Sequence, residues 1–422
     1  MTIISRIDDK GCGCDTLAGD GLISVDQALA EIARRTRPIK GTETVTLQDA
    51  VGRVLSNPVR ALGMVPPFAN AAMDGYAINT ADLVGDGPWH LPVTDRIAAG
   101  ETPRAALNRN EAVQIFTGAP VPDGANAVVM QEDVQHTAKG IRLTRRITPR
   151  THIRAAGEDM VTGKIVAPSG RLLTARDVAA CAAAGHSHLT VCRPLRVALL
   201  VTGNEVCRPG DPRGSAGICD INTPMLCAAS GRPAVTICQS HVAADTKLAL
   251  MTQLAVLSKS VDLIVTTGGI SVGEEDHVKP ALLNLGASID FSGIALKPGK
   301  PVSFGQLNGA YCLGLPGNPL SAFITWQLFG IPLCHALMGQ GPRAALRRHV
   351  VLPRVLHHKP GRCELRLTRL AGFDNLGREV ADFAEATHSG RVASLPQMDG
   401  MLFIPAEEKT LPAGALVEFQ PF

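Results

Sequence analysis

Between residues 194 and 340 the chain alternates short apolar runs with longer segments of helical periodicity. The apolar runs typical of buried strands occupy residues 196–202, 234–239, 261–267 and 287–296. Helical segments follow the first three runs, residues 302–315 read as a β-hairpin, and residues 318–339 read as a long buried helix. This alternation predicts a doubly wound parallel sheet with helices on both faces.

The remaining segments have a different pattern of apolar and polar residues. From about residue 60 to residue 154 short β runs are broken by Gly and Pro, which predicts a small β-rich lobe. Before it, Ser24 and Gln27 form a capping-box pattern for a helix over residues 24–35, and residues 42–55 predict a short strand and a short helix. Residues 174–185 predict another helix. After residue 345 the chain returns to strands, as in a small β barrel.

The chain is therefore expected to be a multidomain α/β protein, since 422 residues suggest two to four domains. The expected units are a disordered tail (1–21), a mixed helical linker domain (22–60 plus 158–193), an inserted β-rich lobe (61–157), a doubly wound domain (194–345) and a C-terminal β-barrel domain (346–422).

Composition and charge narrow the function classes. Forty-one basic and 38 acidic residues give a net charge of only +3, and two Trp and two Tyr leave no large stacking surface, so nucleic acid is not an expected partner. The basic run from Arg142 to Arg154 reads as a solvated β face. No window approaches 18 uninterrupted apolar residues, which predicts a soluble cytoplasmic protein with no membrane contact. Cys12 and Cys14 form an isolated pair whose role stays open.

Candidate chemistry lies in the loops that follow the predicted parallel strands, because ligands of such sheets bind outside the carboxyl ends of the strands. Glu205 follows the strand at 196–202. The loop after 261–267 and the loop after the hairpin contain small and polar residues: Gly268, Gly269, Ser271, Gly273, Asp276, Pro316, Gly317, Asn318, Pro319 and Ser321. All three loops are expected at one edge of the sheet.

These loops are suited to a phosphate ester. Glycines allow backbone N–H groups to approach an anion, and Lys297 and Lys300 add two positive charges in a proline-stiffened turn. Glu205 and Asp276 make sense beside an anion if a divalent cation bridges protein and phosphate. Each feature alone is more often a tight turn, a solvated lysine or a helix cap. Their combination in one sheet favours a phosphate-bearing ligand.

In this order, the motifs "PPFANAAMDGYA", "FTGAPVP", "TGNEV", "TTGGISVGEEDHVK", "KPGKPVSFG" and "GLPGNPLSA" resemble the molybdopterin molybdenumtransferase family of the MoeA type, which corresponds to the C-terminal part of gephyrin. The resemblance runs from about residue 22 to the C-terminus. It implies an elongated homodimer with a small mixed domain, an inserted β lobe, a doubly wound pterin-binding domain and a C-terminal β barrel.

The resemblance also implies a reaction, in which adenylylated molybdopterin receives molybdate and AMP is released. Glu205, Asp245, Asp276 and Lys297 match positions important for activity, Glu205 and Asp276 would hold Mg²⁺ or another divalent cation, and Thr117 would reach a shared cleft from the partner subunit. The implied ligand-binding residues are Gly268, Gly269, Ser271, Gly273, Lys300, Pro301, Pro316, Gly317, Asn318, Pro319 and Ser321. Further partners would be the molybdopterin-adenylylating enzyme and assembly proteins of molybdoenzymes.

The chain departs from the family pattern at several positions, among them Ala155 and Ala156, which replace residues that are often basic. Ala69 stands where the motif usually has Asp, and Gly293 stands where a Lys is common, four residues before Lys297. Three functions therefore stay open. The chain is a working molybdenum insertase, an attenuated paralogue that carries molybdopterin or the finished cofactor, or an insertase for another oxyanion such as tungstate.

Overall fold

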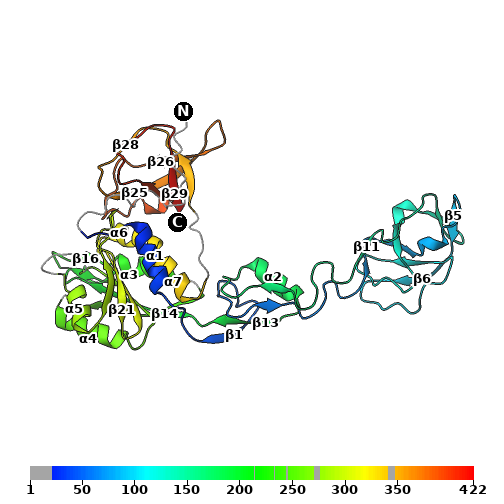
Figure 1. Cartoon of the computed structure of the whole chain (residues 1–422), viewed down its shortest axis with the longest axis horizontal. Coiled ribbons are helices and arrows are strands. Elements are labelled where there is room, and N and C mark those ends of the chain that lie inside the picture. The colour runs from blue at the N-terminus through cyan, green and yellow to red at the C-terminus, as the bar shows by residue number, and fades with distance from the viewer. Residues whose placement is uncertain (1–20, 213, 232, 244–245, 270–275, 341–346) are drawn as a thin grey trace.

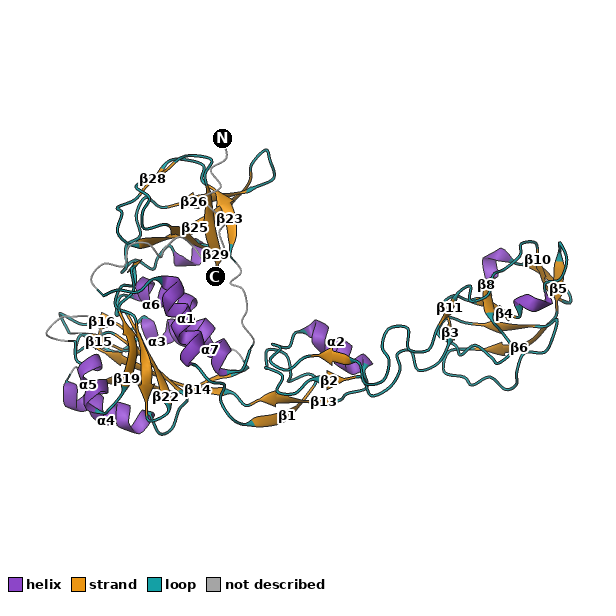
Figure 2. Ribbon diagram, in the orientation of Figure 1, coloured by secondary structure: helices purple, strands orange, loops and turns teal. Residues whose placement is uncertain are grey.

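The computed structural model describes residues 21–212, 214–231, 233–243, 246–269, 276–340 and 347–422. The molecule is elongated (Figure 1). A domain with a mixed sheet and a β barrel lie together at one end, a narrow arm leads away from them, and a β-rich lobe lies at the far end of the arm (Figure 2). The predicted N-terminal tail, with Cys12 and Cys14, lies outside the described residues.

The predicted doubly wound sheet is confirmed, with one strand reversed. Its order is β17 (Val235–Ala243), β14 (Leu195–Thr202), β18 (Leu263–Thr267), β22 (Ala310–Leu315), β21 (Ser303–Leu307) and β19 (Ser288–Ser292). The first four strands are parallel, and β21 pairs antiparallel with both of its neighbours because a tight hairpin joins it to β22.

Helices cover both faces of this sheet, and the alternation of side chains along β14 shows why its sequence is apolar throughout. Val197 and Leu199 belong to one hydrophobic core, and Ala198 and Leu200 belong to the other. The first core includes α3 (Asn222–Ser230), α6 (Pro319–Thr325) and α7 (Ile331–Leu337), and the second includes α4 (Lys247–Leu257) and α5 (Val278–Asn284).

The first helix, α1 (Val25–Arg35), begins with the predicted capping box. Ser24 and Gln27 exchange side-chain-to-backbone hydrogen bonds of 3.0 and 3.1 Å. Its buried residues share the first core with Leu333 and Leu337 of α7. The sequence prediction grouped α1 with the linker domain, whereas its apolar face packs on the sheet domain.

The segment from α6 to α7 is one continuous helical run with a π-helical turn at Trp326–Gly330. By length and composition Pro319–Leu337 could cross a membrane, but 67% of its most apolar window is buried inside the protein. We therefore assign it as the core helix that the sequence predicted.

The arm consists of two strand pairs and a helix. β1 (Thr42–Thr46) pairs with β13 (His188–Cys192), β2 (Val59–Arg60) pairs with β12 (Ile165–Ala167), and α2 (Ala175–Ala183) packs beside them. Residues 47–52 form turns, so the short helix predicted after β1 is absent. The backbone N–H of Gly52 bonds instead to the carbonyl oxygen of Leu173 at 2.8 Å, a long-range contact that a local pattern does not reveal.

The inserted lobe contains three small sheets. The largest has the order β6 (Val93–Ile97), β7 (Ala112–Ile115), β4 (Gly75–Ile78) and β8 (Ala127–Met130). A second has the order β5 (Trp89–Leu91), β10 (Gly140–Leu143) and β9 (Gln135–Thr137), and the third pairs β11 (Ile153–Arg154) with β3 (Asn70–Ala71). Two hydrophobic clusters fill the lobe.

The predicted C-terminal β barrel is also confirmed. Five strands close a ring: β25 (Cys363–Phe373), β26 (Glu379–Phe383), β23 (Arg348–Val351), β29 (Leu416–Pro421) and β27 (Gly400–Ile404), which pairs back to β25. A short pair, β24 (Leu356–His357) with β28 (Thr410–Leu411), lies beside it. One strand of the sheet domain, β20 (Leu296–Lys297), adds to β25 in parallel and so joins the two domains.

Candidate functional site

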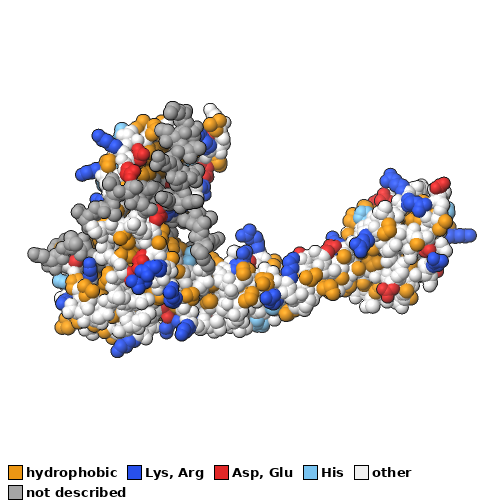
Figure 3. Space-filling view, in the orientation of Figure 1, with side chains coloured by type: hydrophobic (Ala, Val, Ile, Leu, Met, Phe, Trp, Pro, Cys, Tyr) orange, Lys and Arg blue, Asp and Glu red, His pale blue; other side chains and the backbone are white. Residues whose placement is uncertain are grey.

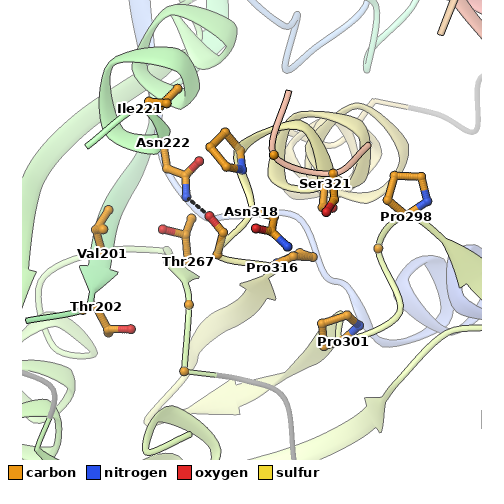
Figure 4. A pocket seen from close by; sticks show the side chains of 18 of the residues that line it. Val201, Thr202, Ile221, Asn222, Thr267, Pro298, Pro301, Pro316, Asn318 and Ser321 are labelled. Carbon is orange, nitrogen blue, oxygen red and sulfur yellow. Dashed lines mark hydrogen bonds between the residues drawn. The ribbon is translucent and has the colours of Figure 1, made fainter. Parts of the chain in front are cut away.

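A cavity of about 1000 Å³ lies where the parallel strands β14, β18 and β22 end, as the topology rule predicts. The three loops expected to meet there do meet, together with the Lys297–Pro301 turn (Figure 4). The predicted residues that line the cavity are Glu205, Gly268, Gly269, Asp276, Lys297, Lys300, Pro301, Pro316, Gly317, Asn318, Pro319 and Ser321.

Four predicted site residues are not among those that line this cavity. Asp245, Ser271 and Gly273 lie outside the described residues. Thr117 follows β7 in the inserted lobe at the other end of the molecule.

The glycines after β18 are needed for the shape of the cavity wall. Gly268 has φ +86° and Gly269 has φ +62°, in the left-handed region that favours glycine. A Cβ at Gly268 would lie 2.9 Å from Oγ1 of Thr202, and one at Gly317 would lie 3.4 Å from Cα of Gly268. The two loops therefore approach each other closely because neither carries a side chain at the contact.

Buried polar atoms line the wall of the cavity near α3. Oγ1 of Thr202, Oγ1 of Thr267 and Oδ1 of Asn222 are buried and have no hydrogen-bond partner within the described residues. The amide nitrogen Nδ2 of Asn222 donates a hydrogen bond to the carbonyl oxygen of Gly317 at 2.8 Å (Figure 4). Buried polar groups normally find partners, so these three atoms are suited to binding the polar edge of a ligand.

The charged lining has both signs. Lys297, Lys300 and Arg362 supply positive charge, and Glu205, Asp220 and Asp276 supply carboxylates. Asp220 is only 5% exposed, and its Oδ1 accepts a hydrogen bond of 2.9 Å from the backbone N–H of Thr223. Within the described residues no three metal-ligating side chains cluster.

Several lining residues were missed by the sequence analysis. Asp220 and Asn222 precede and begin α3, and the helix start at Thr223-Pro224 was a signal that pointed to them. Arg362, Thr387, Ser389 and Gly390 come from the C-terminal barrel. The strand-end rule applies to one sheet, so it gave no sign that a second domain closes the cavity.

In the inserted lobe, the carboxylate of Asp74 accepts hydrogen bonds from the backbone N–H and the hydroxyl of Thr117, at 2.8 and 2.7 Å. These two hydrogen bonds lower the pKa of Asp74 below its usual value. The nearby Ala69 is half-buried, and its carbonyl oxygen accepts from the N–H of Val121 at 3.0 Å. Of the departures from the family pattern, Ala69 lies in this lobe, and Gly293 does not line the cavity.

Two regions of the chain match models of known protein families. Residues 23–185 match the family model for the MoeA N-terminal region (domains I and II), and residues 198–336 match the model for a probable molybdopterin-binding domain. Molybdopterin molybdenumtransferase 2 of Mycobacterium tuberculosis (strain H37Rv) is 32% identical over 400 residues, which cover 93% of this chain and 97% of that protein. The chain belongs to the MoeA family of molybdopterin molybdenumtransferases.

Other members of the MoeA family are also similar to this chain in sequence and in fold. The molybdopterin molybdenumtransferase of Haemophilus influenzae is 33% identical over 320 residues, 76% of this chain and 78% of that protein. The crystal structure of a molybdopterin biosynthesis MoeA protein from Pyrococcus horikoshii superposes with a TM-score of 0.81 at 26% identity, covering 95% of this chain and all of that one. The family resemblance and the fold inferred from the motifs are both confirmed.

Proposed function

We propose that this protein is a molybdopterin molybdenumtransferase that inserts molybdate into adenylylated molybdopterin and releases AMP. The observation that carries the proposal is the cavity of about 1000 Å³, which combines cations, carboxylates and unpaired polar atoms. Most of its lining falls in residues 198–336, the region that matches a probable molybdopterin-binding domain.

The cavity offers separate groups for the anionic part and for the ring of the proposed substrate. Lys297 and Lys300 bind the anionic phosphates and the incoming oxyanion, and the glycine loop lets backbone N–H groups approach them. Asn222, Thr202 and Thr267 hydrogen-bond the polar edge of a heteroaromatic ring. The phosphoanhydride breaks by hydrolysis: a water molecule attacks the adenylyl phosphorus, its oxygen stays in the AMP that is released, and the molybdopterin phosphate is the leaving group that stays in the cavity. Ser271 and Gly273 are included in this proposal because of their positions in the motifs, and Asp245 because it matches a family position important for activity.

Glu205 and Asp276 fit a magnesium ion held jointly with the substrate. Both carboxylates line the cavity, and Mg²⁺ is commonly bound by one or two carboxylates plus substrate phosphates rather than by a complete protein cage. When bound, the ion would neutralise charge on the phosphoanhydride.

The active form is proposed to be a cytoplasmic homodimer in which Thr117 and the loop at 65–78 reach the cavity of the second copy. Hydrophobic side chains are visible along the arm (Figure 3). The exposed hydrophobic residues include Leu62 (63%), Phe68 (45%) and Val161 (57%). These exposed side chains are the proposed candidates for the contact between the two copies. Sedimentation velocity tests the dimer. The molybdopterin-adenylylating enzyme and molybdoenzyme assembly proteins are the proposed further partners.

Ala69 favours a second candidate, a paralogue that binds molybdopterin or the finished cofactor without turnover, because the loop lacks the carboxylate that the family motif has there. An insertase for tungstate is the third. Calorimetric titration with adenylylated molybdopterin, followed by turnover with molybdate or tungstate, separates the three. Lys300→Met should weaken substrate binding, and Lys259→Met, an exposed lysine that does not line the cavity, is the matched control. Equal binding by both variants contradicts the proposed site.

A further inference from the structure

Glu364 is a buried carboxylate at the junction of the barrel and the sheet domain. It lies on β25, is 1% exposed, and accepts hydrogen bonds from three side chains. Nε of Arg366 lies 2.9 Å from Oε1, and Nδ1 of His358 and Nζ of Lys297 lie 3.0 and 3.2 Å from Oε2. Three donors on one carboxylate fix its orientation.

This carboxylate stays ionised. Burial raises the pKa of Glu364, but the hydrogen bonds from His358 and Arg366 and the charges of Arg366 and Lys297 outweigh burial and lower the pKa below its usual value. The buried guanidinium of Arg366 balances the charge of Glu364. An ammonium group has three N–H donors, so Lys297, which gives one of them to Glu364, can also donate to a ligand in the cavity.

Lys297 connects the buried network to the cavity. Its residue lies opposite Glu364 in the β20–β25 pair, and the N–H of Cys363 donates to the carbonyl oxygen of Ala295 at 3.1 Å. Lys297 lines the cavity and its side chain is 45% exposed, whereas Glu364 does not line the cavity. Glu364 can therefore act on a ligand only through Lys297.

We propose that Glu364 is a positioning residue that holds the ammonium group of Lys297 toward the anionic part of the ligand. The proposal rests on the proposed function of the cavity. An exposed lysine loses rotamer freedom when it binds an anion, and a lysine that is already held loses less. The C-terminal barrel thereby contributes to substrate binding with a residue that never touches substrate.

A double-mutant cycle tests this link, with AMP as the calorimetric probe. Glu364→Gln should weaken AMP binding on the order of tenfold, and Lys297→Met should weaken it at least as much. The double variant should bind as Lys297→Met does, because Glu364 acts only through that lysine. Glu379→Gln is the matched control: it removes the ion pair of 2.6 Å with Arg348 in the same barrel and should leave AMP binding unchanged.

Three outcomes overturn the proposal: Glu364→Gln binds AMP as the wild type does, the losses of the two single variants multiply in the double variant, or Lys297→Met has no effect. Because Glu364→Gln leaves Arg366 buried without its carboxylate, the variant could fold poorly. His358→Phe is the second variant, since Nε2 of His358 has no partner within the described residues and the change removes one hydrogen bond to Glu364 without stranding a charge. A weaker loss in AMP binding, about twofold to threefold, is expected.

An NMR measurement on Lys297 tests the positioning by Glu364 independently of the proposed function. Lysines are reductively methylated with ¹³C, and the Lys297 resonance is assigned with Lys297→Arg. A held ammonium group gives a resonance displaced from those of free surface lysines, and His358→Phe should move it toward them. A Lys297 resonance that coincides with the free lysines in the wild type contradicts positioning. If the wild-type protein shows no molybdate-dependent AMP release, the proposed function is contradicted. The Lys297 resonance still tests whether Glu364 holds the ammonium group.

Discussion

The side-chain amide of Asn222 donates a hydrogen bond to the carbonyl oxygen of Gly317 at 2.8 Å. This contact joins the first turn of α3 to the loop between β22 and α6, which are 95 residues apart in sequence. It joins two walls of the cavity through Nδ2 of Asn222, while the amide oxygen Oδ1 has no partner within the described residues.

Asn222→Asp should disturb this contact with almost no change of shape. The new carboxylate cannot donate, so two acceptors face each other, and we expect a loss of about 1–3 kcal/mol in the free energy of unfolding together with weaker AMP binding. Asn284→Asp is the control, because Asn284 donates to the carbonyl oxygen of Pro280 at 2.7 Å on the exposed side of α5. Equal effects of the two variants on AMP binding would rule out a special role for Asn222.

Asp262 should make stability depend on pH. Burial raises its pKa, but hydrogen bonds from Arg193 and Arg196 lower the pKa to about 2. Because the folded pKa lies below the unfolded value, the stabilisation is present above pH 4 and is lost as the pH falls through about 2. Asp262→Asn should cost about 2 kcal/mol at pH 7. Urea unfolding measures this loss, and a variant with the wild-type pH dependence between pH 2 and 4 contradicts the assignment.

Gly293 should not tolerate the lysine that the family pattern suggests. Its φ is +104°, and a Cβ there would lie 2.8 Å from Cδ2 of Leu22. Gly293→Lys and Gly293→Ala should therefore both lower the free energy of unfolding by about 1–2 kcal/mol, and neither should tighten AMP binding. Thermal unfolding and calorimetry provide the measurements. Tighter binding by the lysine variant alone would show that the position faces the ligand after all.

Ala69→Asp should raise molybdate-dependent turnover, by about tenfold, if the missing carboxylate is what limits the rate. Ala69→Asn is the matched control, since it has the same shape without the charge. The comparison is made under initial-rate conditions with equal dimer content. No gain from Asp over Asn would mean that this position does not limit the reaction.

Local patterns predicted most of the sheet domain, because its strands are buried on both faces and helical segments alternate with them along the chain. The same patterns placed the three strand-end loops at one edge, where the cavity lies. Long-range contacts were beyond their reach. The packing of α1 against α7 and the contact of Gly52 with Leu173 depend on which elements meet in three dimensions, whereas the reversal of β21 follows from the hairpin predicted for residues 302–315.

The residues of the candidate site were likewise predicted where local motifs contain them and missed where long-range contacts bring them to the cavity. Residues such as Lys297 and Asn318 stand in motifs with recognisable chemistry, but Glu364 lies in barrel strand β25 and Arg362 directly before it, in a segment that has no motif of its own. Their contribution follows from the pairing of β20 with β25, which only the structure reveals.

The central claim is tested most directly by AMP release from adenylylated molybdopterin by the purified protein, with and without molybdate and Mg²⁺, beside Lys300→Met. We expect release that requires molybdate, is enhanced by Mg²⁺ and falls in the variant. Tight binding of the substrate with no molybdate-dependent release would contradict the insertase and identify a molybdopterin-binding paralogue.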